Sequence, residues 1–221
     1  CTALPPHSRA RVECRTASRE ASGHSRRPCI SLGRMTTTPF GRMVTAMVTP
    51  MKPDGSIDYE GVARLANHLV DNGHDGLVVN GTTGESATTT DEENVETVRA
   101  VVDAVGDRCA VTAGVGTNDT AHSVRAAKAL AAVGADAVLV VTPYYNKPTQ
   151  AGIVEHFKAV VGATDLPAMA YDIPGRTGTP LASDTIRELA KIDQMLAVKD
   201  AKGDFFEATK LMNETDLLWY S

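Results

Sequence analysis

Short apolar runs and amphipathic segments alternate along the chain from about residue 42 onward. The apolar runs are rich in β-branched residues, are bounded by turn residues and are nearly continuous, which is typical of strands buried on both faces. These runs occupy residues 43–49, 76–80, 109–114, 136–142, 167–172, 195–199 and 217–220. The pattern predicts strands separated by segments of a different periodicity.

Between these runs, apolar residues recur at helical spacing. The clearest stripe contains Val95, Val98, Val101 and Val105, and Thr90 with Glu93 forms a capping-box pattern that predicts the start of that helix. Further stripes lie within 59–70, 124–131, 153–161, 186–190 and 206–211. We therefore predict an α/β protein in which six helices alternate with seven strands.

Strict alternation predicts a parallel sheet with right-handed crossovers. Both an open doubly wound sheet and a closed (β/α)8 TIM barrel fit this pattern, and periodicity does not choose between them. A barrel needs eight units and about 250 residues. On the barrel interpretation, the chain contains about six βα units plus a seventh strand and is expected to be truncated at its C-terminus.

Residues 1–34 differ from the rest of the chain. They contain seven Arg, no Lys and two Glu, together with three of the four cysteines, Cys1, Cys14 and Cys29. We predict that 1–34 is a non-native or disordered leader and that 35–221 is the catalytic domain. Either a reading frame that starts too far upstream or an organelle transit peptide would explain this composition. The three cysteines lack Cys-x-x-Cys spacing, which argues against a zinc site.

Charge and composition exclude several classes of function. The net charge is −5, and because the leader carries +5, residues 35–221 carry −10, which argues against a nucleic-acid partner. No apolar run approaches the roughly 18 residues of a membrane span, so we expect no membrane association. Cys109 is the one cysteine outside the leader, which indicates a reducing compartment and predicts a cytoplasmic protein.

Candidate chemistry gathers at the carboxyl ends of the predicted strands, where both architectures place their sites. Lys199 ends the apolar run 195–198. It is either a lysine that leaves the core for solvent, or a desolvated amine of lowered pKa that can form a Schiff base with a carbonyl. Lys202 lies beyond the strand, and we expect it at the surface.

Other strand ends supply hydroxyls and a guanidinium. The turn from Gly81 to Glu85 places Thr82 and Thr83 between glycines, where successive backbone N–H groups can cradle a carboxylate. Tyr145 and Tyr171 are phenols that could relay protons, and Arg176 could clamp a carboxylate. Each of these residues could equally be an ordinary turn, packed aromatic or solvated charge. Together with Lys199 they place an amine, three hydroxyl sources and a guanidinium on one face.

Alternative chemistries find less support. Gly114 and Gly116 lack the third glycine of a dinucleotide-binding turn, and no phosphate-binding loop or G-x-S-x-G motif is present. The six histidines are scattered without metal-ligand spacing, so no metal is expected.

Four strings at these strand ends resemble the dihydrodipicolinate synthase family. They are Gly-Thr-Thr-Gly-Glu-Ser at 81–86, Thr-Pro-Tyr-Tyr-Asn at 142–146, Tyr-Asp-Ile-Pro-Gly-Arg-Thr-Gly at 171–178 and Val-Lys-Asp at 198–200. They occur in that family's order and spacing, and the resemblance runs from about residue 41 to 221. It implies a (β/α)8 barrel with a C-terminal helical extension, assembled as a homotetramer.

The resemblance also implies a Schiff-base lyase of lysine and diaminopimelate biosynthesis. Lys199 would bind pyruvate covalently, with no other cofactor, and the enamine would attack L-aspartate 4-semialdehyde to give 4-hydroxy-tetrahydrodipicolinate. Tyr171 would be the general acid/base, linked through Thr82 to Tyr145 of a neighbouring subunit. Thr83 would hold the pyruvate carboxylate.

Arg176 would bind the carboxylate of the semialdehyde. Other pyruvate-dependent aldolases, such as N-acetylneuraminate lyase, share the Lys and the Tyr. Thr82, Thr83 and Arg176 favour the dihydrodipicolinate branch.

Two further hypotheses remain. The chain could be an inactive fragment of the enzyme, because an incomplete barrel leaves sheet edges bare, or it could be an open-sheet binding protein.

One departure from the family concerns inhibition by lysine. Members that lysine inhibits carry histidines where this chain has Asp91 and Asn94, and His122 stands where an acidic residue contacts the amine of the effector. We therefore expect weak or absent feedback by lysine.

Overall fold

The computed structural model describes residues 38–221. The predicted leader, residues 1–34, with Cys1, Cys14 and Cys29, lies outside the described residues. Of the predicted domain, 35–221, the structure describes all but the first three residues.

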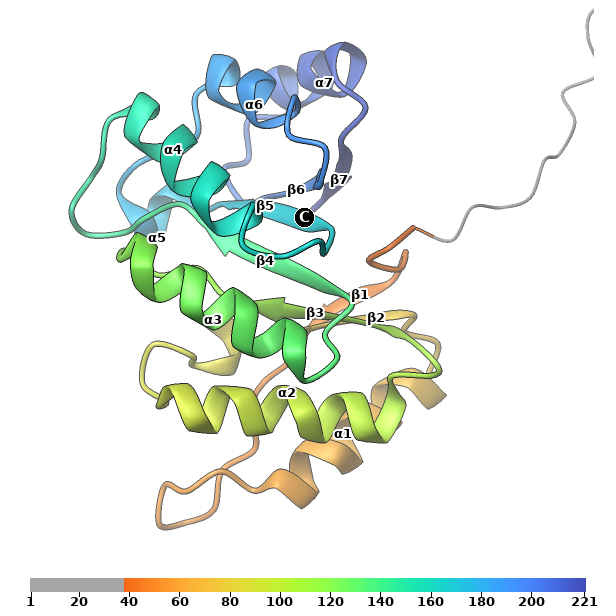
Figure 1. The fold of residues 1–221 in the computed structure, drawn as a ribbon. Coiled ribbons are helices and arrows are strands. Elements are labelled where there is room, and N and C mark those ends of the chain that lie inside the picture. Colours follow the sequence, from red (N-terminus) through yellow and green to blue (C-terminus); the bar gives the residue numbers. More distant parts are fainter. Residues whose placement is uncertain (1–37) are drawn as a thin grey trace, which may run out of the picture. The chain divides into compact units, whose positions relative to one another are not determined.

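Seven parallel strands form one sheet in chain order (Figure 1). Every strand predicted from the sequence is present, and β1 is the most shortened relative to its apolar run. The strands are β1 (Val44–Ala46), β2 (Gly76–Val79), β3 (Ala110–Gly114), β4 (Ala137–Val141), β5 (Ala168–Asp172), β6 (Met195–Asp200) and β7 (Leu218–Tyr220).

Six helices occupy the predicted stripes between the strands. They are α1 (Tyr59–Asp71), α2 (Asp91–Val105), α3 (Thr120–Ala132), α4 (Gln150–Val161), α6 (Ser183–Leu189) and α7 (Phe205–Glu214). The capping box before α2 is formed by Thr90 and Glu93, as predicted. Two further turns, η1 (Thr82–Gly84) and α5 (Pro174–Thr177), are too short to give a periodic signal and were not predicted.

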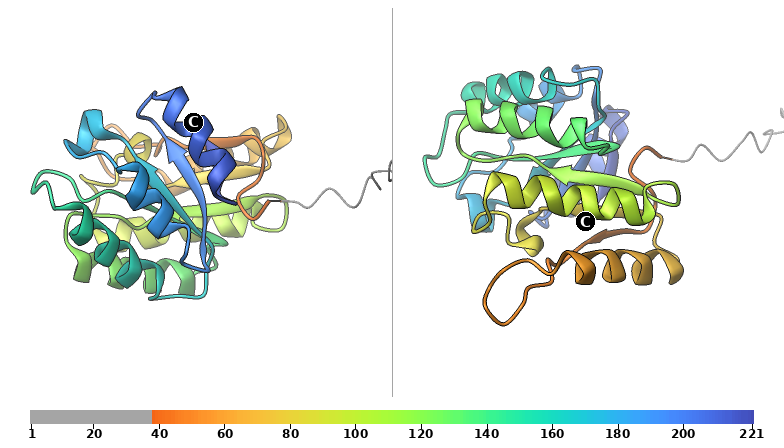
Figure 2. Two further views of the ribbon diagram at one scale, coloured as in Figure 1. Left: turned by 90° about the horizontal axis from the view of Figure 1, so that it is seen from above. Right: turned by 60° about the horizontal axis from the view of Figure 1, so that its bottom comes forward.

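The order of the strands decides between the two architectures that the sequence left open. A doubly wound sheet reverses its strand order at a switch point and carries helices on both faces. Here every strand neighbours the next one in sequence, and the helices pack against one face (Figures 1 and 2). The sheet is therefore the curled wall of a partial (β/α)8 barrel, which confirms the predicted fold class.

Side-chain alternation divides the core into two clusters. The outer cluster lies between sheet and helices and includes Phe157, Leu77 and Leu130. The inner cluster contains strand residues and Phe40, but no helix residue of the described chain. Its buried members are Phe40, Val78, Ala137, Leu139, Met169, Tyr171 and Ala197. This inner face positions the candidate site.

Tyr220 joins the two edges of the sheet. Within residues 38–221, β1 and β7 each pair with one strand. The Tyr220 hydroxyl donates to the Gly41 carbonyl oxygen at 2.7 Å and lies 3.1 Å from Thr38 Oγ1. Its ring packs edge-on against the fully buried Phe40, with ring centroids 6.1 Å apart. One side chain thus ties β7 to the segment that precedes β1.

We expect Tyr220→Phe to lower the free energy of unfolding by about 1 kcal/mol, because it removes a part-buried hydrogen bond and keeps the ring. Urea unfolding followed by circular dichroism would measure the change. Tyr145→Phe is the matched control, since Tyr145 is 88% exposed. Equal unfolding midpoints for the two variants would contradict a role for Tyr220 in joining the edges.

Candidate active site

Lys199 and Tyr171 lie side by side on the inner face, at the carboxyl ends of β6 and β5. Parallel pairing places Tyr171 opposite Lys199, and Lys199 opposite Tyr220 on β7. Lys199 Nζ lies 4.4 Å from the centroid of the Tyr171 ring, within the range of a cation–π contact. Sheet register alone therefore brings the predicted amine and the predicted phenol together.

Burial lowers the pKa of Lys199. The amine projects onto a face that also carries Met169 and Ala197, and it forms none of the salt bridges found among residues 38–221. An ammonium that is desolvated and unpaired gives up its proton more readily than one in water. The lowered pKa increases the fraction of neutral amine, which is the nucleophilic form.

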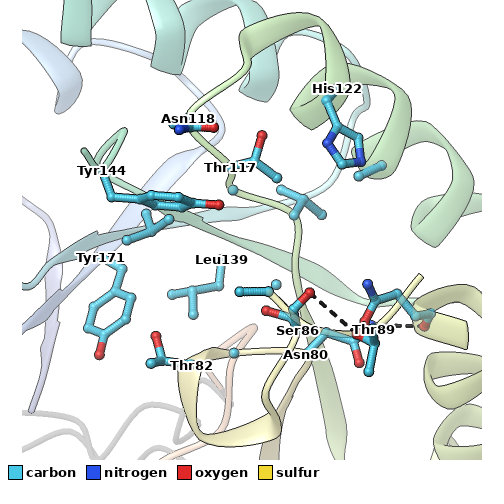
Figure 3. Close-up of a pocket in the computed structure, with 18 of the residues that line it drawn as sticks. Asn80, Thr82, Ser86, Thr89, Thr117, Asn118, His122, Leu139, Tyr144 and Tyr171 are labelled. Carbon is cyan, nitrogen blue, oxygen red and sulfur yellow. Dashed lines mark hydrogen bonds between the residues drawn. The ribbon is translucent and has the colours of Figure 1, made fainter. Parts of the chain in front are cut away.

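A cavity of about 1390 Å³ opens at the carboxyl ends of the strands (Figure 3). Of the predicted site residues, Thr82, Tyr145, Tyr171 and Arg176 line it. Lys199 does not line this cavity itself but contacts Tyr171, which does. The predicted residues that line the cavity lie at or after the ends of three different strands, β2, β4 and β5.

The turn that carries Thr82 and Thr83 is held by the segment that follows β1. Thr49 Oγ1 donates to the Gly84 carbonyl oxygen at 2.7 Å, and a Cβ on Gly84 would lie 3.2 Å from both Thr49 Oγ1 and the Met47 carbonyl oxygen. Both threonines are exposed, and Thr82, but not Thr83, is among the residues that line the cavity. Sequence reasoning missed Thr49, because a lone threonine after a strand gives no signal.

Tyr145 lines the cavity, as does its neighbour Tyr144, which Figure 3 labels. Tyr145 is nevertheless 88% exposed, and its φ is 73°. Within the described residues, no hydrogen bond links Tyr145, Thr82 and Tyr171. The expected relay through Tyr145 is thus not assembled within one chain.

Arg176 lies in the one-turn helix α5, between β5 and α6. Its side chain is exposed, lines the cavity and takes no part in the salt bridges of residues 38–221. An exposed guanidinium with no carboxylate partner in this part of the chain is available for an anionic ligand.

The described residues hold neither a cluster of metal ligands nor a helix that could span a membrane. No group of three or more His, Cys, Asp or Glu side chains within 38–221 is placed to hold a metal ion. None of the helices in that range combines the length and apolar character needed to cross a membrane.

Comparison with known proteins identifies the family. The model of the dihydrodipicolinate synthetase family matches residues 39–221. The chain belongs to this family. It is similar to the 4-hydroxy-tetrahydrodipicolinate synthase of Acidothermus cellulolyticus (57% identity over 183 residues, 83% of this chain) and to that of Mycolicibacterium paratuberculosis (59% over 182 residues, 82% of this chain).

Solved structures of family members agree with the fold. A dihydrodipicolinate synthase from Bacillus anthracis superposes with a TM-score of 0.81 at 46% identity, over 82% of this chain and 63% of that one. The enzyme from Cyanidioschyzon merolae, solved with lysine bound, gives 0.80 at 44% identity, over 83% of this chain and 63% of that one. The chain spans 59% and 61% of the lengths of the two curated enzymes named above.

Lys202 differs from its predicted placement near this dihydrodipicolinate synthase-like site, and it lies beside a buried carboxylate, Asp172. Lys202, predicted at the surface, has a side chain only 20% exposed and lies 3.7 Å from Asp172 Oδ2. That prediction was wrong because the loop after β6 folds back against the loop after β5. Asp172, which sequence reasoning did not select, is 1% exposed, and burial raises the pKa of its carboxyl group.

We expect the apparent pKa of Lys199 to lie below the ordinary lysine value of about 10.4, because burial disfavours the ammonium form. Amine acylation at a series of pH values, read by peptide mass spectrometry, would measure it. Nα-acetyl-lysine amide in the same mixture serves as the control. A Lys199 that titrates at or above the control would contradict the desolvation argument.

Proposed function

We propose that the protein is a Schiff-base lyase that condenses pyruvate with L-aspartate 4-semialdehyde. The product would be 4-hydroxy-tetrahydrodipicolinate, an intermediate of lysine and diaminopimelate biosynthesis. The observation that carries the proposal is the half-buried amine of Lys199, of lowered pKa, in contact with the ring of Tyr171. The names of the curated relatives support the substrates.

In this proposal, the neutral amine of Lys199 adds to the ketone carbon of pyruvate and gives a carbinolamine. Loss of water forms the imine, and loss of a methyl proton forms the enamine. The enamine carbon then attacks the aldehyde carbon of the second substrate. Cyclisation of the adduct through the substrate's own amino group releases Lys199. In this proposal the reaction uses the covalent bond between Lys199 and pyruvate and needs no separate cofactor.

Proton transfer would fall to Tyr171. Its phenol stands at the strand end opposite Lys199, where it can protonate the leaving carbinolamine oxygen. Thr82 would connect it with Tyr145 of a neighbouring subunit. The exposure of Tyr145 supports this part of the proposal, because a side chain 88% exposed is free to enter a second copy.

Two further groups would bind substrate carboxylates. Thr83 and the adjacent backbone of η1 would hold the carboxylate of pyruvate, and Arg176 that of the semialdehyde. The exposed threonines and the exposed guanidinium support these roles. We further propose a cytoplasmic homotetramer, in line with the resemblance and with the contact that Tyr145 would make.

Treatment with pyruvate and borohydride should attach a reduced pyruvyl group to Lys199, found by peptide mass spectrometry. Lys199→Arg should abolish the label, because a guanidinium is not nucleophilic at neutral pH. Tyr171→Phe should slow labelling by about 10²- to 10⁴-fold, the usual contribution of a general acid/base.

Lys191→Arg is the control for this experiment, since Lys191 forms an exposed salt bridge with Glu188. It should label like the unchanged chain. A label on another lysine, or undiminished labelling of Lys199→Arg, would refute the proposed role of Lys199.

The cavity also contains the residues on which the expected weak inhibition by lysine was based. There, His122 Nε2 lies 2.7 Å from Asp91 Oδ1, and the pair links the starts of α3 and α2. Both residues line the cavity, as does Asn94, whose backbone carbonyl accepts a hydrogen bond from Asn80. We propose that this pairing leaves the carboxylate of Asp91 less available to an effector amine.

We expect L-lysine at millimolar concentration to bind the chain weakly, as measured by calorimetry. His122→Glu should strengthen binding by about tenfold, because it replaces the partner of Asp91 with a second carboxylate for the ammonium group. His122→Gln, which adds no charge, is the control. Tight binding by the unchanged chain would contradict the expectation.

A further inference from the structure

Asp172, Lys202 and the backbone of Leu181 form a closed set of contacts behind the active site. Asp172 Oδ1 accepts a hydrogen bond from the Leu181 N–H at 3.1 Å. Lys202 Nζ donates to the Leu181 carbonyl oxygen at 3.5 Å and lies 3.7 Å from Asp172 Oδ2. Both backbone polar groups of Leu181 are thus bound by one ion pair.

These contacts close the loop that carries Arg176. The loop leaves β5 directly after Asp172 and returns to it at Leu181, which is 1% exposed. Within the loop, Thr177 Oγ1 donates to the carbonyl oxygens of Ile173 and Thr179 at 3.1 and 3.0 Å. The interior of the loop is internally bonded, so its anchoring at Leu181 sets where Arg176 stands.

The other end of the ion pair is fixed to the strand of Lys199. Lys202 follows Lys199 by three residues, and its N–H donates to Asp200 Oδ1 at 2.8 Å. The Ala201 N–H donates to the carbonyl oxygen of Asp172 at 2.9 Å. The pair therefore links the loop after β5 with the loop after β6.

Burial makes the pair sensitive to the loss of either partner. Asp172 is 1% exposed and the Lys202 side chain 20% exposed. Removal of one charge leaves the other desolvated without compensation, whereas removal of both charges leaves neither unpaired. The two kinds of substitution should therefore have different effects.

We propose that Asp172 and Lys202 are positioning residues for the second substrate, which hold Arg176 at a set distance from the amine of Lys199. This inference rests on the proposed function. Pyruvate reacts at the strand ends, where register alone places Lys199 and Tyr171, so its attachment should not depend on the pair. Capture of the carboxylate-bearing aldehyde by Arg176 should depend on it.

The test uses the 221-residue chain and measures the concentration of L-aspartate 4-semialdehyde that halves labelling of Lys199 by pyruvate and borohydride. Lys202→Met should raise this concentration by about tenfold, the loss expected for a charge-assisted contact. Labelling without the aldehyde should be unchanged. Lys191→Met, at an exposed salt bridge, is the control and should leave both readouts unchanged.

Two combined variants test whether the effect passes through Arg176. In an Arg176→Ala background, Lys202→Met should add nothing, because the residue it positions is gone. Asp172→Asn with Lys202→Met should recover part of the loss seen in Lys202→Met alone. The proposal would be overturned if Lys202→Met had its full effect on the aldehyde concentration in the Arg176→Ala background. It would also be overturned if Lys202→Met reduced pyruvate labelling without the aldehyde by the same factor.

Hydrogen exchange separates this proposal from the proposed function. The peptide covering 173–182 should exchange faster in Lys202→Met than in Lys191→Met, and equal exchange would overturn the proposal even in a chain that takes no label. Absence of pyruvate labelling in the unchanged chain would instead refute the proposed function. Faster exchange would still support the link between the two loops in that case.

Discussion

The placement of an amine on the apolar inner face of a parallel sheet is the constraint on which the site depends. Lys199 is directed inward because its neighbours Val198 and Ala197 alternate between the outer and inner clusters. A shift of one residue in register would turn the amine toward the helices. The chemistry of the site is therefore set by the same pairing that builds the sheet.

The inner face carries both large buried side chains and a glycine that lines the cavity. Phe40 and Met169 are buried in the inner cluster, whereas Gly114, at the end of β3, lines the cavity. Tyr220 extends this packing by joining β7 to the segment before β1. The buried side chains of the inner cluster thus stabilise the sheet, and the cavity lies at the carboxyl ends of its strands.

The sequence predicted the repeating strands and helices and the residues with reactive side chains. Apolar runs gave all seven strands, and the end of one run singled out Lys199. Periodicity could not separate a barrel from an open sheet, because strand order is a long-range property. Thr49 and Asp172 were not selected, since each acts through one backbone group of a loop whose folded position the sequence does not show. The prediction that Lys202 lies at the surface was wrong because its burial depends on how the loop after β6 packs against the loop after β5.

Site residues on strands and site residues on loops are held in different ways. This difference separates imine formation from the condensation in the proposed reaction. Register fixes Lys199 against Tyr171 without help from any loop. Arg176 depends on the anchoring of Leu181, whereas Tyr145, 88% exposed, has no such anchor within the described chain. Under the proposed function, Tyr145 would be placed by a neighbouring molecule. Imine formation should therefore tolerate changes in loops and assembly better than the condensation that follows it.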